Sequence, residues 1–330
     1  MSNRGISVVI PNYNGKKLLQ QTLPTVFAAL EVCGLPFEVI ISDDASTDES
    51  VFFLQQHYLE AKYICSRVNR GFSPTINAGI AAARYDLVLL LNSDVKLTEN
   101  YFSPLLRYFD HEDTFGVMGR IVGWDDDVTQ DAAKYPAFQG AKIKTSGNYY
   151  LAKPTQKDWL FSMYLSGANA LVDRHKLALL GGFDEIFAPF YVEDFELSLR
   201  AWRLGWKCYY EHAAVCRHQV STSIKSKESK TFINAIYYRN KMFMHALHLE
   251  GVRKTLWYLQ LLPEMLIHLV TGRMYYFKSL HMFFGARQKM LLSKQKFAAV
   301  AQQQGKHLIP VEQVVRSIRS AAAQKEIKKF

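Results

Sequence analysis

The chain has 330 residues, enough for one large α/β domain with an appendage or for two modest domains. Apolar residues make up 49% of it and aromatic residues 13%, so a sizeable core can form and a wholly disordered chain is excluded. The formal charge of +10 is uneven: residues 1–200 carry 18 basic and 24 acidic side chains, whereas residues 201–330 carry 22 and 6. The basic C-terminal part is therefore expected to meet an anionic partner, such as a membrane surface or a nucleic acid.

The four cysteines contain no Cys-x-x-Cys pair, which favours buried reduced thiols and a cytoplasmic location. The first residues run into a strand-like segment without the apolar core of a signal peptide. The longest apolar stretch, residues 256–270, is interrupted by Gln260, Pro263, Glu264 and His268. No stretch reaches the roughly 18 apolar residues of a spanning helix, so we expect a protein that does not cross a membrane.

Short apolar and β-branched runs in the first 91 residues predict strands, and the segments between them have helical spacing. The expected strands cover residues 6–10, 37–41, 63–65 and 86–91. The expected helices cover residues 16–32 and 73–84, and the polar residues 46–49 suit the start of another helix. Strands that alternate with helices in this way predict a mainly parallel, doubly wound sheet.

The middle of the chain is less regular. A strand is expected at 115–119, a helix at 192–204 and a strand at 206–210, with regular pattern also at 161–172. Residues 124–157 are polar and aromatic without clear periodicity, so we expect a long loop that is functional or mobile.

From residue 231 onward the pattern predicts helices rich in Tyr, Phe, Met, Lys and Arg. Basic residues such as Arg273 and Lys278 stand among apolar ones such as Trp257 and Phe284, which is typical of helices that lie in a membrane interface. The alternative is an ordinary helical pack whose aromatic residues fill a core. The tail after Gln302 is polar and weakly helical.

The triplet Asn92-Ser93-Asp94 directly follows the apolar run 86–91. A carboxylate at the carboxyl end of such a strand lies at the mouth of an open α/β sheet, where ligands usually bind. A hard divalent cation there would take an Asp94 oxygen on one side and phosphate oxygens on the other.

Two earlier strands also end in polar residues. Pro11 closes the first strand, where it withholds an amide donor and can leave neighbouring backbone groups open to a nucleobase, although alone this is only a strand end. Asp43 and Asp44 follow the second strand and can accept hydrogen bonds from a pyrimidine or from ribose hydroxyls. The alternative is a cluster of helix-capping acids.

Two helix starts carry further candidates. At the first, Gly71 gives backbone freedom and Arg70 could meet a phosphate, which the helix N-terminus also favours. At the second, Glu193 and Asp194 either stabilise the helix dipole or provide a general base in Asp194. Neighbouring carboxylates raise one another's pKa, which keeps such a base useful.

Together these segments resemble the family 2 glycosyltransferases of GT-A fold, and look closest to the rhamnosyltransferase-like branch that builds bacterial surface polysaccharides. The matching segments, in the family's order, are residues 8–14, 43–48, 69–79, 92–94 and 181–200. The resemblance covers about residues 5–220. It implies an α/β fold, with a mainly parallel open sheet flanked by helices, as a catalytic domain over 1–220. The basic, aromatic helical region would occupy 221–330.

The resemblance also implies roles for single residues. Asp194 would be the catalytic base, Glu193 would contact the acceptor, and Asp94 would bind Mg²⁺ or Mn²⁺ with His218 as a further metal or diphosphate ligand. The implied donor-binding residues are Pro11, Asn12, Tyr13, Asp43, Asp44, Arg70, Gly71, Asn77, Asn92 and Ser93. From the residues alone, His218 reads as a structural histidine. Asn92 stands where many relatives carry a first Asp, so we expect weaker metal affinity without loss of activity. The segment 124–157 has no aligned motif and is expected to shape the acceptor pocket.

The expected function is inverting transfer of a sugar from a nucleotide diphosphate donor, a UDP- or dTDP-sugar, to a glycan or polyprenyl-linked acceptor. The enzyme would work on the inner face of the cytoplasmic membrane as a peripheral protein, and it would bind no nucleic acid. A sugar nucleotidyltransferase would carry a Gly-rich phosphate loop near its N-terminus, which residues 9–14 are not. A non-catalytic scaffold would be expected to lack Asp94 or Asp194, and both are present.

Overall fold

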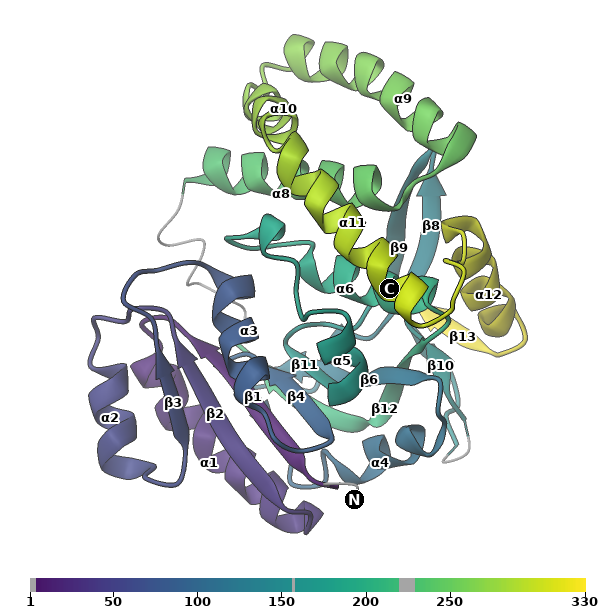
Figure 1. Cartoon of the computed structure of the whole chain (residues 1–330). Helices are drawn as coiled ribbons and strands as arrows, with labels where there is room; N and C mark the ends of the chain where they lie inside the picture. The colour runs from purple at the N-terminus through teal and green to yellow at the C-terminus, as the bar shows by residue number, and fades with distance from the viewer. Residues whose placement is uncertain (1–3, 156–157, 220–228) are drawn as a thin grey trace.

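The computed structural model describes residues 4–155, 158–219 and 229–330 (Figure 1). Within these residues a ten-stranded mixed sheet has the order β10-β12-β6-β11-β4-β1-β2-β3, with β5 beside β12 and β7 beside β6. A separate three-stranded sheet has the order β13-β9-β8.

The first half of the large sheet is the predicted doubly wound unit. The strands β1 (Ile6–Asn12), β2 (Phe37–Asp43), β3 (Lys62–Cys65) and β4 (Leu87–Leu91) run parallel to one another. They alternate with α1 (Lys16–Cys33), α2 (Ser50–His57) and α3 (Phe72–Ala82). Neighbouring residues of β1 belong to different cores, because Val8 packs with α1 and α2 whereas Val9 packs with α3. Apolar side chains on both faces explain why β1 and β4 read as continuous apolar runs.

The second half of the sheet mixes directions. Here β11 (Asn169–Asp173) lies antiparallel between β4 and β6 (Thr114–Gly123), and β12 (Lys207–His218) runs parallel to β6. The short strands β5 (Val95–Leu97) and β10 (Leu160–Phe161) each pair antiparallel with β12. The intervening helices are α4 (Ser103–Leu106), η1 (Arg107–Asp110), α5 (Arg174–Leu179), η2 (Glu185–Phe187) and α6 (Glu193–Arg203).

The long loop expected over residues 124–157 is wrong where the structure describes that segment. It forms β7 (Thr129–Asp131), β8 (Ala133–Gln139) and β9 (Lys142–Leu151), the last two as an antiparallel hairpin. The buried positions of the hairpin include Ala133, Lys134 and Tyr149 rather than an alternating series of large apolar residues. The alternation of buried and exposed residues along its strands is therefore not visible as an apolar pattern in the sequence.

The helices predicted after residue 231 are present. They are α8 (Lys230–His248), α9 (Gly251–Val270), α10 (Tyr275–Gly285), α11 (Arg287–Gln303) and α12 (Val311–Ala323), followed by β13 (Ile327–Lys329). The tail is more ordered than predicted, because α12 buries one stripe that includes Val311, Val314 and Ile318, and β13 pairs with β9.

The alternative of an ordinary helical pack holds for some of the C-terminal aromatic residues, whereas the membrane-interface reading stays a prediction. Trp257, Tyr276 and Phe283 are fully buried, in a cluster that also contains Leu90 of β4 and Leu197 of α6. Other apolar side chains of α9 are exposed. Within the described residues, no helix combines the length and the apolar character needed to cross a bilayer. The boundary expected at residue 220 lies outside the described residues and stays a prediction.

Candidate active site

The carboxyl ends of β1 and β2 carry the first predicted donor-binding residues. Asn12 ends β1, opposite Asp43 of β2, and its Nδ2 donates to Asp43 Oδ1 at 2.7 Å. Asn12 Oδ1 is buried without a hydrogen-bond partner within the described chain. Pro11 is half-buried and the ring of Tyr13 is 43% exposed. An unused acceptor and an exposed ring suit a nucleoside, although that contact stays a prediction.

Asp44 ties two loops together at the same edge. Its Oδ1 accepts a hydrogen bond from the backbone N–H of Arg70 at 2.8 Å, and its Oδ2 accepts one from Gly71 at 2.9 Å. The side chain of Arg70 is half-exposed and pairs with Glu185 at 3.4 Å. Asp44 therefore fixes the entrance of α3, and its predicted contact with the donor would use the remaining lone pairs.

Gly71 is where the loop before α6 touches the entrance of α3. Its φ is +88°, and a Cβ there would lie 2.6 Å from the Cα of Pro189. The backbone N–H of Phe72 donates to the carbonyl of Pro189 at 2.8 Å. Only glycine permits this close approach, which brings the segment ahead of Glu193 against the predicted donor loop.

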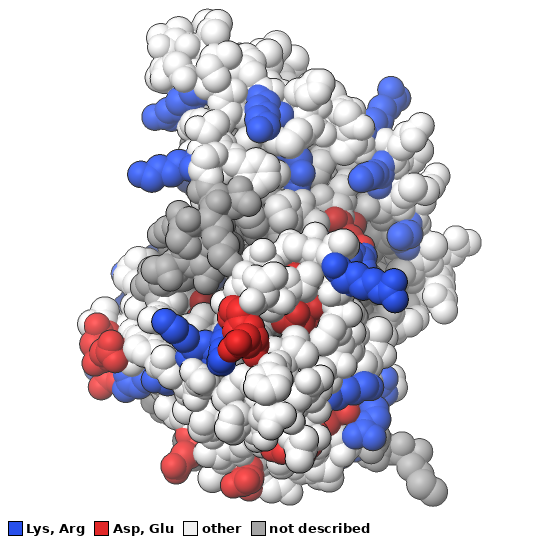
Figure 2. Space-filling view, turned by 90° about the vertical axis from the view of Figure 1, so that its left-hand side faces the viewer, with Lys and Arg blue, Asp and Glu red and all other residues white. Residues whose placement is uncertain are grey.

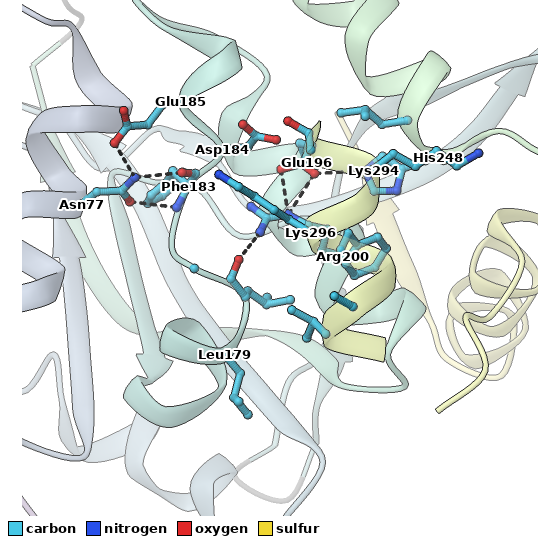
Figure 3. A pocket seen from close by; sticks show the side chains of 17 residues that line it. Asn77, Leu179, Phe183, Asp184, Glu185, Glu196, Arg200, His248, Lys294 and Lys296 are labelled. Atoms are coloured by element: carbon cyan, nitrogen blue, oxygen red, sulfur yellow. Dashed lines mark hydrogen bonds and ion pairs between the residues drawn. The ribbon is translucent and has the colours of Figure 1, made fainter. Parts of the chain in front are cut away.

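Asn77 is engaged by protein instead of facing the sheet mouth (Figure 3). Its Nδ2 donates to the carbonyl of Phe183 at 2.8 Å, and its Oδ1 accepts from the N–H of the same residue at 2.9 Å. Both ends of the amide hold the segment that leads to α6, so the structure lends no support to a donor contact by Asn77.

Asp94 and His218 are neighbours, although they lie far apart in the chain. The pairing of β5 with β12 sets His218 opposite Val95, one residue after Asp94. His218 Nε2 is 3.5 Å from Asp94 Oδ2, and the N–H of Gln219 donates to the carbonyl of Asp94 at 3.1 Å. The structure thus brings the two predicted metal ligands together.

This pair fits a hard divalent cation. Asp94 Oδ1 is buried and has no hydrogen-bond partner in the part of the chain that the structure describes. Those residues also contain no group of three or more His, Cys, Asp or Glu that could hold a metal. A carboxylate and an imidazole would therefore supply two ligands. Substrate phosphates and water would supply the others, as they commonly do for Mg²⁺.

The segment before β11 connects the Asp94 side of the site with the Asp194 side. The backbone N–H of Asn92 donates to the carbonyl of Ala168 at 3.2 Å. The preceding residue, Gly167, gives its backbone N–H to the carboxylate of Asp194. Ser93 is half-buried between Asn92 and Asp94. The residues predicted to bind the donor phosphates and the predicted catalytic base therefore border one region at the carboxyl end of β4.

Glu193 and Asp194 are the first two residues of α6. Asp194 keeps some solvent exposure, but it also borders a small cavity lined by apolar residues such as Leu90, Phe115 and Leu197. Its Oδ1 accepts a hydrogen bond from the N–H of Phe195 at 2.7 Å.

Burial raises the pKa of both carboxyl groups, and the charge of Asp194 raises the pKa of Glu193 further. The nearby ammonium of Lys134 opposes the increase in the pKa of Asp194. Asp194 therefore loses its proton first, while Glu193 stays protonated longer and can donate a hydrogen bond.

Lys134 is a site residue that the sequence analysis missed. It lies on β8, is 7% exposed, pairs with Asp131 and donates to Asn148 Oδ1 at 2.9 Å. Its Nζ is 5.3 Å from the ring centroid of Tyr164, which stacks on Phe195 beside Asp194. The hairpin thus brings a cation near Asp194, and the role of 124–157 in shaping the acceptor pocket stays a prediction. No local motif marks this lysine.

A pocket of about 500 Å³ lies next to this region, between α6 and α11 (Figure 3). Arg200 pairs there with Glu196 and donates to the carbonyls of Leu180 and Gly182, while His248 Nε2 lies 3.1 Å from Glu196. Neither Asp94 nor Asp194 lines this pocket. Its buried charges are already matched, so we interpret the network as structural.

Comparisons with known proteins concern the family and the fold. Residues 7–179 match the model of the family described as Glycosyl transferase family 2. The chain is 24% identical over 239 residues to a chondroitin synthase of Pasteurella multocida, which covers 63% of this chain but only 24% of the synthase. It is 25% identical over 240 residues to an N-acetylglucosaminyl-diphospho-decaprenol L-rhamnosyltransferase of Mycobacterium tuberculosis, covering 66% of this chain and 77% of that protein.

Among solved structures, the chain resembles GalNAc-T7, crystallised with UDP, GalNAc and Mn²⁺. The TM-score is 0.64 at 14% identity, and the match covers 98% of this chain and 58% of GalNAc-T7. This likeness shows the fold, a GT-A sheet flanked by helices with further helices at the C-terminus, as predicted.

Proposed function

Because the chain belongs to glycosyl transferase family 2, we propose that it transfers a sugar from a nucleotide diphosphate donor to a hydroxyl group of a glycan or lipid-linked acceptor. One observation carries this proposal: two groups of side chains lie on either side of the segment 167–168. Asp94 and His218 are in contact on one side, and the adjacent carboxyl groups of Glu193 and Asp194 lie on the other. A diphosphate on the first side leaves the anomeric carbon facing the carboxylates.

Asp94 and His218 would hold Mg²⁺ or Mn²⁺, which supplies positive charge to stabilise the departing diphosphate. Asn92 and Ser93, between β4 and β5, would line the ribose and diphosphate. Pro11, Asn12 and Tyr13 would surround the nucleobase of the donor. The Mn²⁺ bound to GalNAc-T7, a protein of this fold, supports the choice of a divalent metal.

Asp194 would accept the proton of the attacking hydroxyl as the new C–O bond forms at the anomeric carbon. The bond from that carbon to the diphosphate breaks on the opposite face, and the electron pair leaves with the nucleotide. Because attack and departure occur on opposite faces, the anomeric configuration inverts. Protonated Glu193 would donate a hydrogen bond to the acceptor, and Asp194 would later release its proton to water.

The finer assignment is a UDP- or dTDP-sugar as donor and a polyprenyl-linked acceptor used at the inner face of the cytoplasmic membrane, for the synthesis of cell-surface polysaccharide. The rhamnosyltransferase relative acts on a decaprenol-linked sugar, as its name states, and supports this choice of acceptor. Complexes of the same fold with UDP support the donor class.

The test is a screen for nucleotide release from UDP-, dTDP- and GDP-sugars with Mn²⁺ or Mg²⁺, in the presence of soluble glycan and lipid-linked acceptors. The proposal expects release from a UDP- or dTDP-sugar that depends on both metal and acceptor. Release from a GDP-sugar alone would contradict the donor assignment, and no metal-dependent release from any donor would contradict the proposed function.

A further inference from the structure

The outer face of α9 is an exposed apolar strip. Its inner side buries Trp257, Leu261 and His268 against the rest of the protein. The opposite arc of the helix carries large apolar side chains that are between 52% and 78% exposed. Among them are Leu256, Leu259, Leu262, Leu266, Leu269 and Val270. A contiguous strip of this kind marks an interaction surface.

Basic side chains follow this strip in the chain. The exposed side chains of Arg273, Lys278, Arg287 and Lys289 follow it in α10, in α11 and in the turn before α10. The sole acidic residue between positions 251 and 303 is Glu264. It is half-buried and bonded to Lys142, Gln260 and Tyr276. Figure 2 shows the side of the molecule that is on the left in Figure 1, and among its coloured residues the upper part, over the C-terminal helices, carries Lys and Arg without Asp or Glu.

We propose that this α9 strip, bordered by the cations of α10 and α11, docks on an anionic lipid bilayer with α9 lying in the interface. Apolar side chains would enter the acyl boundary while the cations meet lipid phosphates. A second copy of the chain fits less well, because a two-fold contact would set like charges against each other. The proposal deepens the membrane-bound acceptor of the proposed function, but its test uses no sugar substrate.

The test is co-sedimentation of the full chain with vesicles of phosphatidylcholine alone and of phosphatidylcholine with phosphatidylglycerol. We expect binding to the anionic vesicles that weakens in high salt, and a loss of roughly tenfold or more in the double variant Leu262→Glu/Leu266→Glu. The control Leu59→Glu makes the same chemical change at an 82% exposed leucine after α2 and should bind normally.

Two results would overturn the docking proposal. One is wild-type protein that stays in the supernatant with anionic vesicles at low salt. The other is a double variant that sediments like the wild type while its sedimentation coefficient falls from dimer to monomer, which would make the strip a contact between copies. Nucleotide release with a soluble acceptor should be unchanged in the double variant, so a loss there would concern catalysis, not docking.

A second inference comes from Asn240 of α8, which is fully buried. Its Nδ2 lies 2.6 Å, 2.9 Å and 2.8 Å from the carbonyl oxygens of Phe187, Phe190 and Tyr191. Its Oδ1 accepts from Arg239 at 2.8 Å. The two residues that follow Phe190 have positive φ, 76° for Tyr191 and 75° for Val192. For a β-branched residue such as Val192 this is a strained conformation that its surroundings must hold.

We infer that Asn240 is a positioning residue that holds the 187–192 segment so that Glu193 and Asp194 face the acceptor. This inference rests on the proposed function of Asp194. Asn240→Ala should lower kcat by about 100-fold, because small displacements of a catalytic group have effects of that size. Calorimetric affinity for UDP with Mn²⁺ should stay unchanged, which a general loss of structure would not allow.

The matched control is Gln260→Ala, which removes an amide that binds the backbone of Gln139 and Ala141 at the hairpin turn. It should keep the wild-type kcat. If Asn240→Ala folds poorly, Val192→Gly in the same chain relieves the strain and should restore the melting temperature without restoring kcat. An unchanged kcat in Asn240→Ala, or full recovery of kcat in the double variant, would overturn the inference.

Discussion

The Nε2 of His218 lies 3.5 Å from the Oδ2 of Asp94, at the point where β12 passes β5 beside the end of β4. The second carboxylate oxygen of Asp94 is buried and has no hydrogen-bond partner within the described residues. A buried polar atom without a partner is costly unless something else satisfies it. A divalent cation bound with the donor diphosphate would do so.

Removal of either side chain should weaken metal-dependent donor binding. His218→Ala and Asp94→Ala should each reduce the affinity for UDP with Mn²⁺ by roughly tenfold or more. A loss of about tenfold is typical when a residue that only hydrogen-bonds to a metal ligand is removed. Isothermal titration calorimetry with and without Mn²⁺ measures this effect.

The control is His175→Ala, at the other end of β4, where the Nε2 of the exposed His175 lies 3.6 Å from the half-buried Asp86. This variant should bind UDP and Mn²⁺ like the wild type. Equal binding by His218→Ala and the wild type would remove His218 from the metal site.

The rate should fall at low pH through the titration of Asp194. Burial raises the pKa of Asp194 above the usual range of an aspartate, and the base acts only when it is ionised. The acid limb of kcat/KM against pH should therefore lie above that of an ordinary aspartate, near 4.

Lys134→Met should move this limb to higher pH, because the ammonium of Lys134 favours the ionised form of Asp194. Lys144→Met, on β9 of the same hairpin, serves as the control and should leave the profile in place. A limb near pH 4, or a shift to lower pH in Lys134→Met, would contradict the assignment of the base.

Gly71→Ala should destabilise the protein more than Gly34→Ala. Both residues have positive φ, but a Cβ at Gly34 meets nothing within 4 Å, whereas a Cβ at Gly71 would lie 2.6 Å from Pro189. Gly34→Ala should cost about 1 kcal/mol in the free energy of unfolding, and Gly71→Ala should cost more and also lower kcat. Urea unfolding measures the loss of stability, and nucleotide release measures kcat. An equal loss of unfolding free energy in the two variants would show that Pro189 moves away from the new Cβ without cost.

The sequence was sufficient for those parts whose signals are local. The apolar runs that became β1 and β4 predicted the parallel sheet, and the position of Asp94 after β4 predicted its place at the mouth. Lys134 could not be found in this way. The buried positions of its hairpin include alanine, lysine and tyrosine, so the sequence shows no clear alternation of apolar and polar residues. Asn240 likewise gains its importance only from carbonyl groups on a distant segment. Asn77 matched a motif, but its amide is used by Phe183.

The most direct test of the account is nucleotide release by Asp194→Asn, measured beside calorimetric binding of UDP with Mn²⁺. The account predicts that transfer is abolished while the donor nucleotide still binds with nearly wild-type affinity. Sugar transfer by Asp194→Asn at the wild-type rate would contradict it.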